Sequence, residues 1–218
     1  ESLVPFLNEL DIPVNYEKRE NILDTPIIKT MSLIFECIVA ASKQQQALVD
    51  QLLPVIFSLD FWHIPIEAIW RTNWHAASHS ATKSWTELAL ENDSLRSPTL
   101  FILKLGSQGS VMPLEYAFDF ITGVQPIEIE PNTFYTSPLK EYYFSKDAEA
   151  SSRTQYYEAL SHLSVIRAKL REYQVGTEEL LTAQDFTNFV AMYRTAEEPL
   201  INSHPIAQRE KAVSLMTA

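Results

Sequence analysis

The sequence has very little glycine and a single cysteine. Four glycines are spread over 218 residues, which disfavours glycine-rich phosphate loops and all-β folds with many tight turns. Cys37 is the one cysteine, so an internal disulfide framework and a zinc site with several cysteine ligands are both excluded. Because Cys37 stands in the apolar run MSLIFECIVA, we expect a buried structural thiol rather than a nucleophile.

Positive charge is also scarce. Lys and Arg number 17 against 28 Asp and Glu, which gives a net charge of -11. This balance opposes non-specific nucleic-acid binding by the chain as a whole. No apolar run approaches the roughly 20 residues that a membrane-spanning helix needs, and no signal-peptide pattern opens the chain. We therefore expect a cytoplasmic protein without a membrane partner.

The common catalytic motifs are missing too. The chain contains no Gly-x-Ser-x-Gly elbow, no Walker-type loop and no Gly-x-Gly-x-x-Gly fingerprint. His75 and His79 have the H-x-x-x-H spacing of some zinc sites, but Ala76 stands where a hydrolytic site needs Glu. We interpret both histidines as surface or packing residues. A metal-dependent hydrolase built on His75 and His79 therefore ranks behind the two function classes described below. His162 and Cys37 each lie in a helical apolar pattern, so we interpret both as structural residues. We predict no catalytic residue, no bound metal and no cofactor within the 218 residues.

What the sequence does contain is a series of helical patterns, with apolar residues three and four positions apart. We expect a cap at Asp24 or Thr25 before Pro26, and a kink or a new helix at Pro54. The third helix has Ile66, Ile69, Trp70 and Asn73 in helical sequence. The expected helices start near 26, within 45–59, within 60–78, within 80–90, on either side of Gly106 to Gly109, at about 148–173, and within 181–198.

Caps and loops complete this prediction. Ser80 or Thr82 should cap the fourth helix, and Thr182 should cap the last one. The segment 125–146 is rich in proline and aromatics, so we expect a long ordered loop there. A helical pattern over 3–10 precedes the first strand-like run.

Two short strand-like runs lie near the two ends of the chain. Ile12, Val14 and Tyr16 alternate in one, and Val213 and Leu215 alternate in the other. We therefore predict a mainly α fold, a multi-helix bundle-like domain with two short terminal strands from a parent α/β domain. The chain would be a fragment of a longer protein or an insertion within an α/β domain.

Both ends resemble one protein family. The stretch LVPFLNELDIPVNYEKRENILDTPIIKTMSLI is similar to the part of UvrD/Rep-type superfamily 1 DNA helicases that leaves the second RecA-like domain and enters its insertion. DIP corresponds to the family's G-I-P strand. Ile28 and Lys29 match the family's E-I-K-D motif, whereas Ile27 and Thr30 replace its acids. The closing AVSLMTA resembles the strand that opens helicase motif V.

The resemblance implies three parts and an accessory role. Residues 1–17 would be a stub of the second RecA-like domain, 18–208 the helical insertion called 2B, and 209–218 the returning strand. In this family the insertion rotates about its connecting strands, contacts duplex DNA ahead of the fork and modulates unwinding. Its partners would be the helicase core domains and, through the parent protein, DNA. ATP and Mg²⁺ would bind to the parent's core and not to these residues.

Lys18, Arg19 and Lys29 are the candidate nucleic-acid-binding residues. They cluster at the junction between the first strand and the first helix of the insertion, and phosphate contacts need clustered positive charge. By contrast, we interpret Arg167, Lys169 and Arg171 as a solvated helix face.

A helical protein-interaction module without catalytic activity is the alternative function. It accounts equally well for the acidity and the missing catalytic motifs, but not for the two strands. An insertion makes a geometric prediction, since both strands must enter one sheet. They should lie roughly 10 Å apart if a central strand separates them. Otherwise they should pair with each other, or with the edge of a second copy.

Overall fold

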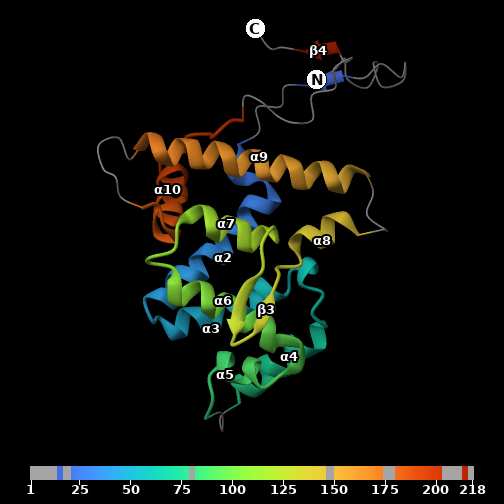
Figure 1. The fold of residues 1–218 in the computed structure, drawn as a ribbon, viewed down its shortest axis with the longest axis vertical. Coiled ribbons are helices and arrows are strands. Elements are labelled where there is room, and N and C mark those ends of the chain that lie inside the picture. The colour runs from blue at the N-terminus through green and yellow to red at the C-terminus, as the bar shows by residue number, and fades with distance from the viewer. Residues whose placement is uncertain are drawn as a thin grey trace.

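The computed structural model describes residues 14–16, 21–78, 82–145, 150–173, 180–202 and 213–215, of which 14–16, 150–152, 173 and 213–215 are described by backbone alone. Helices make up most of this part of the chain (Figure 1), which confirms the mainly α prediction. The helices are α2 Pro26–Ser42, α3 Gln46–Phe57, α4 Ile66–Ala76, α5 Trp85–Leu90, α6 Asp93–Gln108, α7 Leu114–Thr122, α8 Leu139–Phe144, α9 Ala150–Tyr173 and α10 Ala183–Thr195. Short 3-10 turns lie at Ile22–Asp24 and Asp60–Trp62, and the strands are β1 Val14–Tyr16, β2 Ile127–Glu130, β3 Thr133–Tyr135 and β4 Val213–Leu215.

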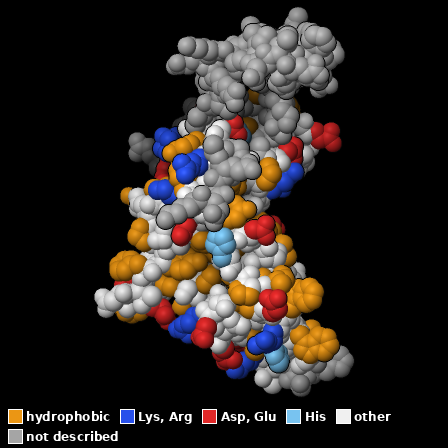
Figure 2. All heavy atoms as spheres, turned by 90° about the vertical axis from the view of Figure 1, so that its right-hand side faces the viewer, with side chains coloured by type: hydrophobic (Ala, Val, Ile, Leu, Met, Phe, Trp, Pro, Cys, Tyr) orange, Lys and Arg blue, Asp and Glu red, His pale blue; other side chains and the backbone are white. Residues whose placement is uncertain are grey.

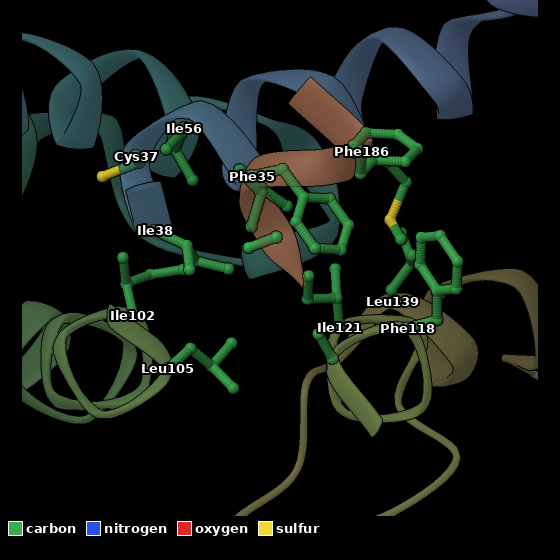
Figure 3. Packing of buried hydrophobic residues seen from close by; sticks show 14 of the residues in the cluster. Phe35, Cys37, Ile38, Ile56, Ile102, Leu105, Phe118, Ile121, Leu139 and Phe186 are labelled. Atoms are coloured by element: carbon green, nitrogen blue, oxygen red, sulfur yellow. The ribbon is translucent and has the colours of Figure 1, made fainter. Parts of the chain in front are cut away.

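Helix α2 is the central element of the helical body. It begins at Pro26 after Thr25, as the sequence predicts, because proline suits the first turn of a helix. Its apolar residues are buried against α3, α6 and α10. Phe35 lies in the middle of this core, with its ring 4.5 Å from that of Phe186 and 5.4 Å from that of Phe118 (Figure 3). The core therefore joins helices from both halves of the sequence.

Helices α2 and α6 approach each other closely at a glycine. A Cβ atom on Gly106 would lie 2.4 Å from the Cβ of Ala41. Gly106 lies inside α6, which runs on to Gln108. The two helices predicted for this stretch are confirmed as α6 and α7, but the chain leaves α6 at Gly109 and not at Gly106 as predicted. Pro54 likewise lies inside α3, which continues to Phe57.

The sequence predicts the N-terminal caps of both α10 and α5, one correctly and one wrongly. The predicted cap of α10 is confirmed: Thr182 donates from its backbone N and its Oγ1 to Asp185 Oδ2, both at 2.8 Å. The predicted cap of α5 is wrong, because the helix begins after Ser84. The Ser84 Oγ accepts from the backbone N of Glu87, whose carboxylate accepts from the backbone N of Ser84. This capping box outcompetes Thr82.

The predicted loop over 125–146 contains regular structure instead. Strands β2 and β3 form an antiparallel hairpin, and α8 follows it. Asn132 has the left-handed φ of 63° that the tight turn requires, and its backbone N donates to Glu128 Oε1 at 2.8 Å. Ile127 and Ile129 are buried and hold the hairpin on the body, where β2 packs against α6.

The chain enters and leaves the helical body at one place, which we call the neck: Asn21, Ile22, Leu200 and Ile201. Asn21 and Ile201 form an antiparallel bridge, and the backbone N of Ile22 donates to the Leu200 carbonyl at 2.8 Å. The Asn21 Oδ1 accepts from the backbone N of Leu23 and of Leu200, at 3.2 and 3.1 Å. One side chain thus ties two segments that are 179 residues apart.

Beyond the neck, β1 and β4 pair with each other in parallel. Val14 lies opposite Val213, Asn15 opposite Ser214, and Tyr16 opposite Leu215. This confirms that the two strands lie side by side, and it shows direct pairing rather than a separation of two strand widths. Figure 1 shows this pair beyond α9, at the end of the molecule opposite α4 and α5. The predicted helix over 3–10, as well as Ile12, lies outside the described residues.

Candidate functional site

Of the three residues that the sequence predicts to contact DNA, the structure describes one, Lys29. Lys18 and Arg19 lie outside the described residues. Lys29 is exposed in the first turn of α2, close to the neck in sequence, and its Nζ lies 3.5 Å from Asp24 Oδ1. An exposed ion pair of this kind contributes about 0 to 1 kcal/mol. Lys29 is therefore available to a phosphate at little cost.

Two cations of the long helix α9, Lys169 and Arg171, are paired with acids. Arg171 donates to Glu115 Oε1 at 2.7 Å, and Lys169 donates to Glu172 Oε2 at 2.8 Å. The hydrogen bond to Glu172 raises the pKa of Lys169. These pairs agree with the interpretation of this helix as a solvated face rather than a phosphate-binding stripe.

The structure does not assemble a catalytic centre from the candidates named in the sequence. Cys37 is buried, and burial, with Glu36 and Asp50 nearby, raises its pKa to about 12, so the thiol stays protonated at neutral pH. His75 is exposed on α4, and its possible partner His79 lies outside the described residues. Among the described residues, no three His, Cys, Asp or Glu side chains are grouped so that they could hold a metal ion.

The surface that sequence reasoning missed is on α4. Ile66, Trp70 and Trp74 are 45%, 69% and 79% exposed. They follow one another at intervals of four, so they form a single stripe, which we call the α4 face. The helical spacing in the sequence groups Trp70 and Asn73 with Ile66 and Ile69 and does not say which of them face the core. In the structure Ile69 and Thr72 are buried, and the two tryptophans point away from the body.

Contacts on the inner side of α4 explain this orientation. The indole Nε1 of Trp85, at the start of α5, donates to Asn73 Oδ1 at 2.6 Å. The Thr72 hydroxyl donates to the Ala68 carbonyl at 2.9 Å, so this buried hydroxyl has its hydrogen bond within α4. Asn73 therefore faces α5, and Trp70 and Trp74 fall on the outer side of the helix.

An acidic hollow adjoins the α4 face, between α4 and the start of α6. Its volume is about 450 Å³, and it is lined by Pro65, Glu67, Ala68, Arg71, Glu91, Asn92, Asp93 and Ser94. Three of these residues carry a carboxylate and one carries a guanidinium. Glu91 accepts from Lys83, whereas Glu67 and Asp93 have no ion-pair partner within the described parts of the chain. Figure 2, which shows the right-hand side of Figure 1, has hydrophobic and charged side chains interspersed at the lower end of the molecule.

Comparisons with known proteins identify no relative of this chain. No family model, no curated protein and no solved structure matches it. Within the described residues, no helix is both long enough and apolar enough to cross a membrane. The neck, the paired strands and the α4 face are therefore the features from which a function can be inferred.

Proposed function

We propose that this chain is the helical insertion subdomain of an ATP-dependent DNA helicase of the UvrD/Rep type, with an accessory role in duplex engagement. The observation that carries the proposal is the parallel pairing of β1 with β4 across the whole helical body. Parallel neighbours need a crossover connection, and here that crossover is the helical body between Tyr16 and Val213.

The neck supports the same proposal. The chain enters the body at Asn21 and leaves it at Ile201, and these two residues are adjacent. The body is therefore joined to the rest of the chain by two neighbouring connections, as an inserted subdomain is. Hinges are commonly a few residues at the ends of elements, and the neck is such a place. A subdomain held in this way is suited to rotating about its connections.

Sheet energetics also point to a parent domain. Parallel sheets occur almost only where helices cover both of their faces. Among the residues that the structure describes, β1 and β4 pair only with each other, and the outer edge of each strand would present unpaired backbone groups there. In the RecA-like sheet that the resemblance implies, β1 and β4 would flank a central strand, and direct pairing is the arrangement expected without it. ATP and Mg²⁺ would then bind to the core domains of the parent.

A protein-interaction module is the second candidate, and the exposed α4 face is the observation that favours it. Tryptophans left in water on a rigid helix are typical of binding surfaces. This function does not exclude the first, because an accessory subdomain can also bind a partner.

Titration with a forked DNA duplex at low salt tests the DNA contact. We expect weak binding that falls as salt rises, because the candidate contacts are phosphate contacts by Lys18, Arg19 and Lys29. Changing Arg19→Glu together with Lys29→Glu should weaken binding and reduce the salt slope by about 2. The matched control is Arg153→Glu with Arg194→Glu, two exposed positions on α9 and α10. Equal binding by the two double variants would refute the assignment.

The helicase assignment itself is tested by ATP hydrolysis. The 218 residues contain no glycine-rich loop to hold phosphates, so they should hydrolyse no ATP. The longer natural chain implied by the proposal should show DNA-stimulated hydrolysis. Absence of that activity from the longer chain would exclude the helicase and leave the interaction module.

A further inference from the structure

The α4 face leaves two large aromatic side chains in water although the fold has buried two others. Trp62 and Trp85 are buried in the core, whereas Trp70 and Trp74 are among the most exposed apolar side chains of the described residues. Contiguous exposed apolar surface marks interaction sites. Tryptophan is also the residue type most enriched where binding energy concentrates in protein interfaces.

The α4 face is held in place before any partner arrives. Ile69 anchors α4 in the core, and the Asn73 side chain is bonded to Trp85 of α5. Thr86, next along α5, donates from its backbone N to Asp50 Oδ1 of α3 at 2.9 Å. Helices α3, α4 and α5 are thereby linked, so little ordering entropy opposes binding at this surface.

The hollow beside the α4 face carries more negative than positive side chains. In the hollow next to the tryptophans, Glu67, Glu91 and Asp93 face a single Arg71. Lys83 is engaged with Glu91, which leaves Glu67 and Asp93 as the carboxylates open to an incoming cation. Glu67 lies on α4 itself, one turn from Trp70 and Arg71, so the acidic and aromatic surfaces are continuous.

We propose that the α4 face and the adjoining acidic hollow form a docking surface for a basic amphipathic segment of a partner protein. Trp70, Trp74 and Ile66 would bury the apolar side of that segment. Lys or Arg side chains of the segment would pair with Glu67 and Asp93 and lie over the indole rings, which attract cations. This proposal goes beyond the helicase assignment and does not depend on it.

Electrostatics favours this occupant over two others. A nucleic acid would bring phosphates to the open carboxylates of Glu67 and Asp93, and like charges repel at close range. A second copy of this chain would carry the same net charge of -11 to an acidic surface. A basic segment meets favourable potential both at the hollow and from the molecule as a whole.

The test uses a synthetic helical peptide of about 15 residues, built from leucine and lysine on opposite faces, with a leucine–glutamate peptide of the same pattern as control. Binding is followed by fluorescence anisotropy of the labelled peptide and by the emission of the exposed tryptophans. We expect a blue shift when the basic peptide binds, because Trp70 and Trp74 leave water. The acidic peptide should produce neither signal.

Variants locate the binding surface. Trp70→Ala with Trp74→Ala should reduce affinity for the basic peptide about 30-fold or more. Glu67→Lys with Asp93→Lys should reduce it about tenfold and weaken its salt dependence. The matched control is Phe134→Ala, since Phe134 is 66% exposed on β3, outside this surface. All of these side chains are exposed, and circular dichroism verifies that the variants fold.

The other occupants give distinct results. Equal binding of the acidic and basic peptides, or equal losses from the Phe134 and tryptophan variants, would overturn the proposal. Tighter binding of oligothymidine that is lost in the tryptophan variants would assign the surface to single-stranded nucleic acid instead. Self-association of the 218-residue chain that the tryptophan variants abolish would assign it to a second copy.

Discussion

Phe35→Ala is expected to lower the free energy of unfolding by about 3 to 5 kcal/mol. Phe35 is fully buried on α2. Its ring packs at 4.5 Å against that of Phe186 from α10 and, edge to face at 5.4 Å, against that of Phe118 from α7. Truncation removes the apolar transfer energy, leaves a cavity and breaks two aromatic pairs. Urea denaturation followed by circular dichroism measures the change.

The control is Phe134→Ala, which truncates an exposed phenylalanine on β3. It should change the free energy of unfolding by no more than about 0.5 kcal/mol. If the two variants have the same stability, Phe35 is not at the centre of the core, and the packing of α2 against α7 and α10 (Figure 3) is wrong.

Gly123→Ala is expected to destabilise the protein by about 2 to 4 kcal/mol. Gly123 ends α7 with a φ of 78°, a conformation that costs a residue with a side chain about 1 kcal/mol or more. An added Cβ would also lie 2.4 Å from the Ser137 carbonyl oxygen and 3.3 Å from the Lys140 backbone N. Backbone atoms cannot rotate away as a side chain can, so the start of α8 must move.

Gly109→Ala supplies the comparison for this prediction. Gly109 follows α6 with a right-handed φ of -59°, and its nearest neighbour would be the side chain of Ile38 at 3.2 Å. We expect a change of about 1 kcal/mol or less there, measured by the same denaturation. A Gly123 variant as stable as the Gly109 variant would contradict the close approach of α7 and α8.

Features with a local cause could be predicted from the sequence. The start of α2 at Pro26 and the cap of α10 at Thr182 depend on a few neighbouring residues, and both predictions are confirmed. The predicted helix at about 148–173 matches α9, whose apolar spacing is long and regular. The strand-like alternation near both ends is confirmed at Val14–Tyr16 and Val213–Leu215.

Features that depend on distant contacts could not be predicted in the same way. Helix α4 keeps apolar spacing on two faces, and the bond from Trp85 to Asn73 together with the burial of Ile69 decides which face turns inward. The sequence therefore could not reveal that Trp70 and Trp74 are exposed. Glycine is a helix breaker by local rules, which is why the sequence predicts a break at Gly106. The reason for a glycine there is the close contact with Ala41 of α2, which is distant in the sequence.

The candidate sites differ in the same way: one could be predicted from the sequence and the other could not. Clustering of Lys18, Arg19 and Lys29 is visible in the sequence, and in the structure Lys29 is exposed beside Asp24. The DNA contact of all three stays a prediction. The α4 face and the acidic hollow depend on how α4 meets the start of α6, which no spacing in the sequence encodes.

The most direct test of the insertion geometry is a disulfide between β1 and β4. Asn15 and Ser214 are opposite each other in the parallel ladder, and neighbouring strands about 4.8 Å apart allow a disulfide. Cys37 is buried with a raised pKa and does not compete. After mild oxidation of Asn15→Cys with Ser214→Cys, mass spectrometry should find the bond within a monomer, while each single variant stays unbridged. Free thiols, or bridges only between molecules, would contradict the claim that both ends of the helical body enter one sheet.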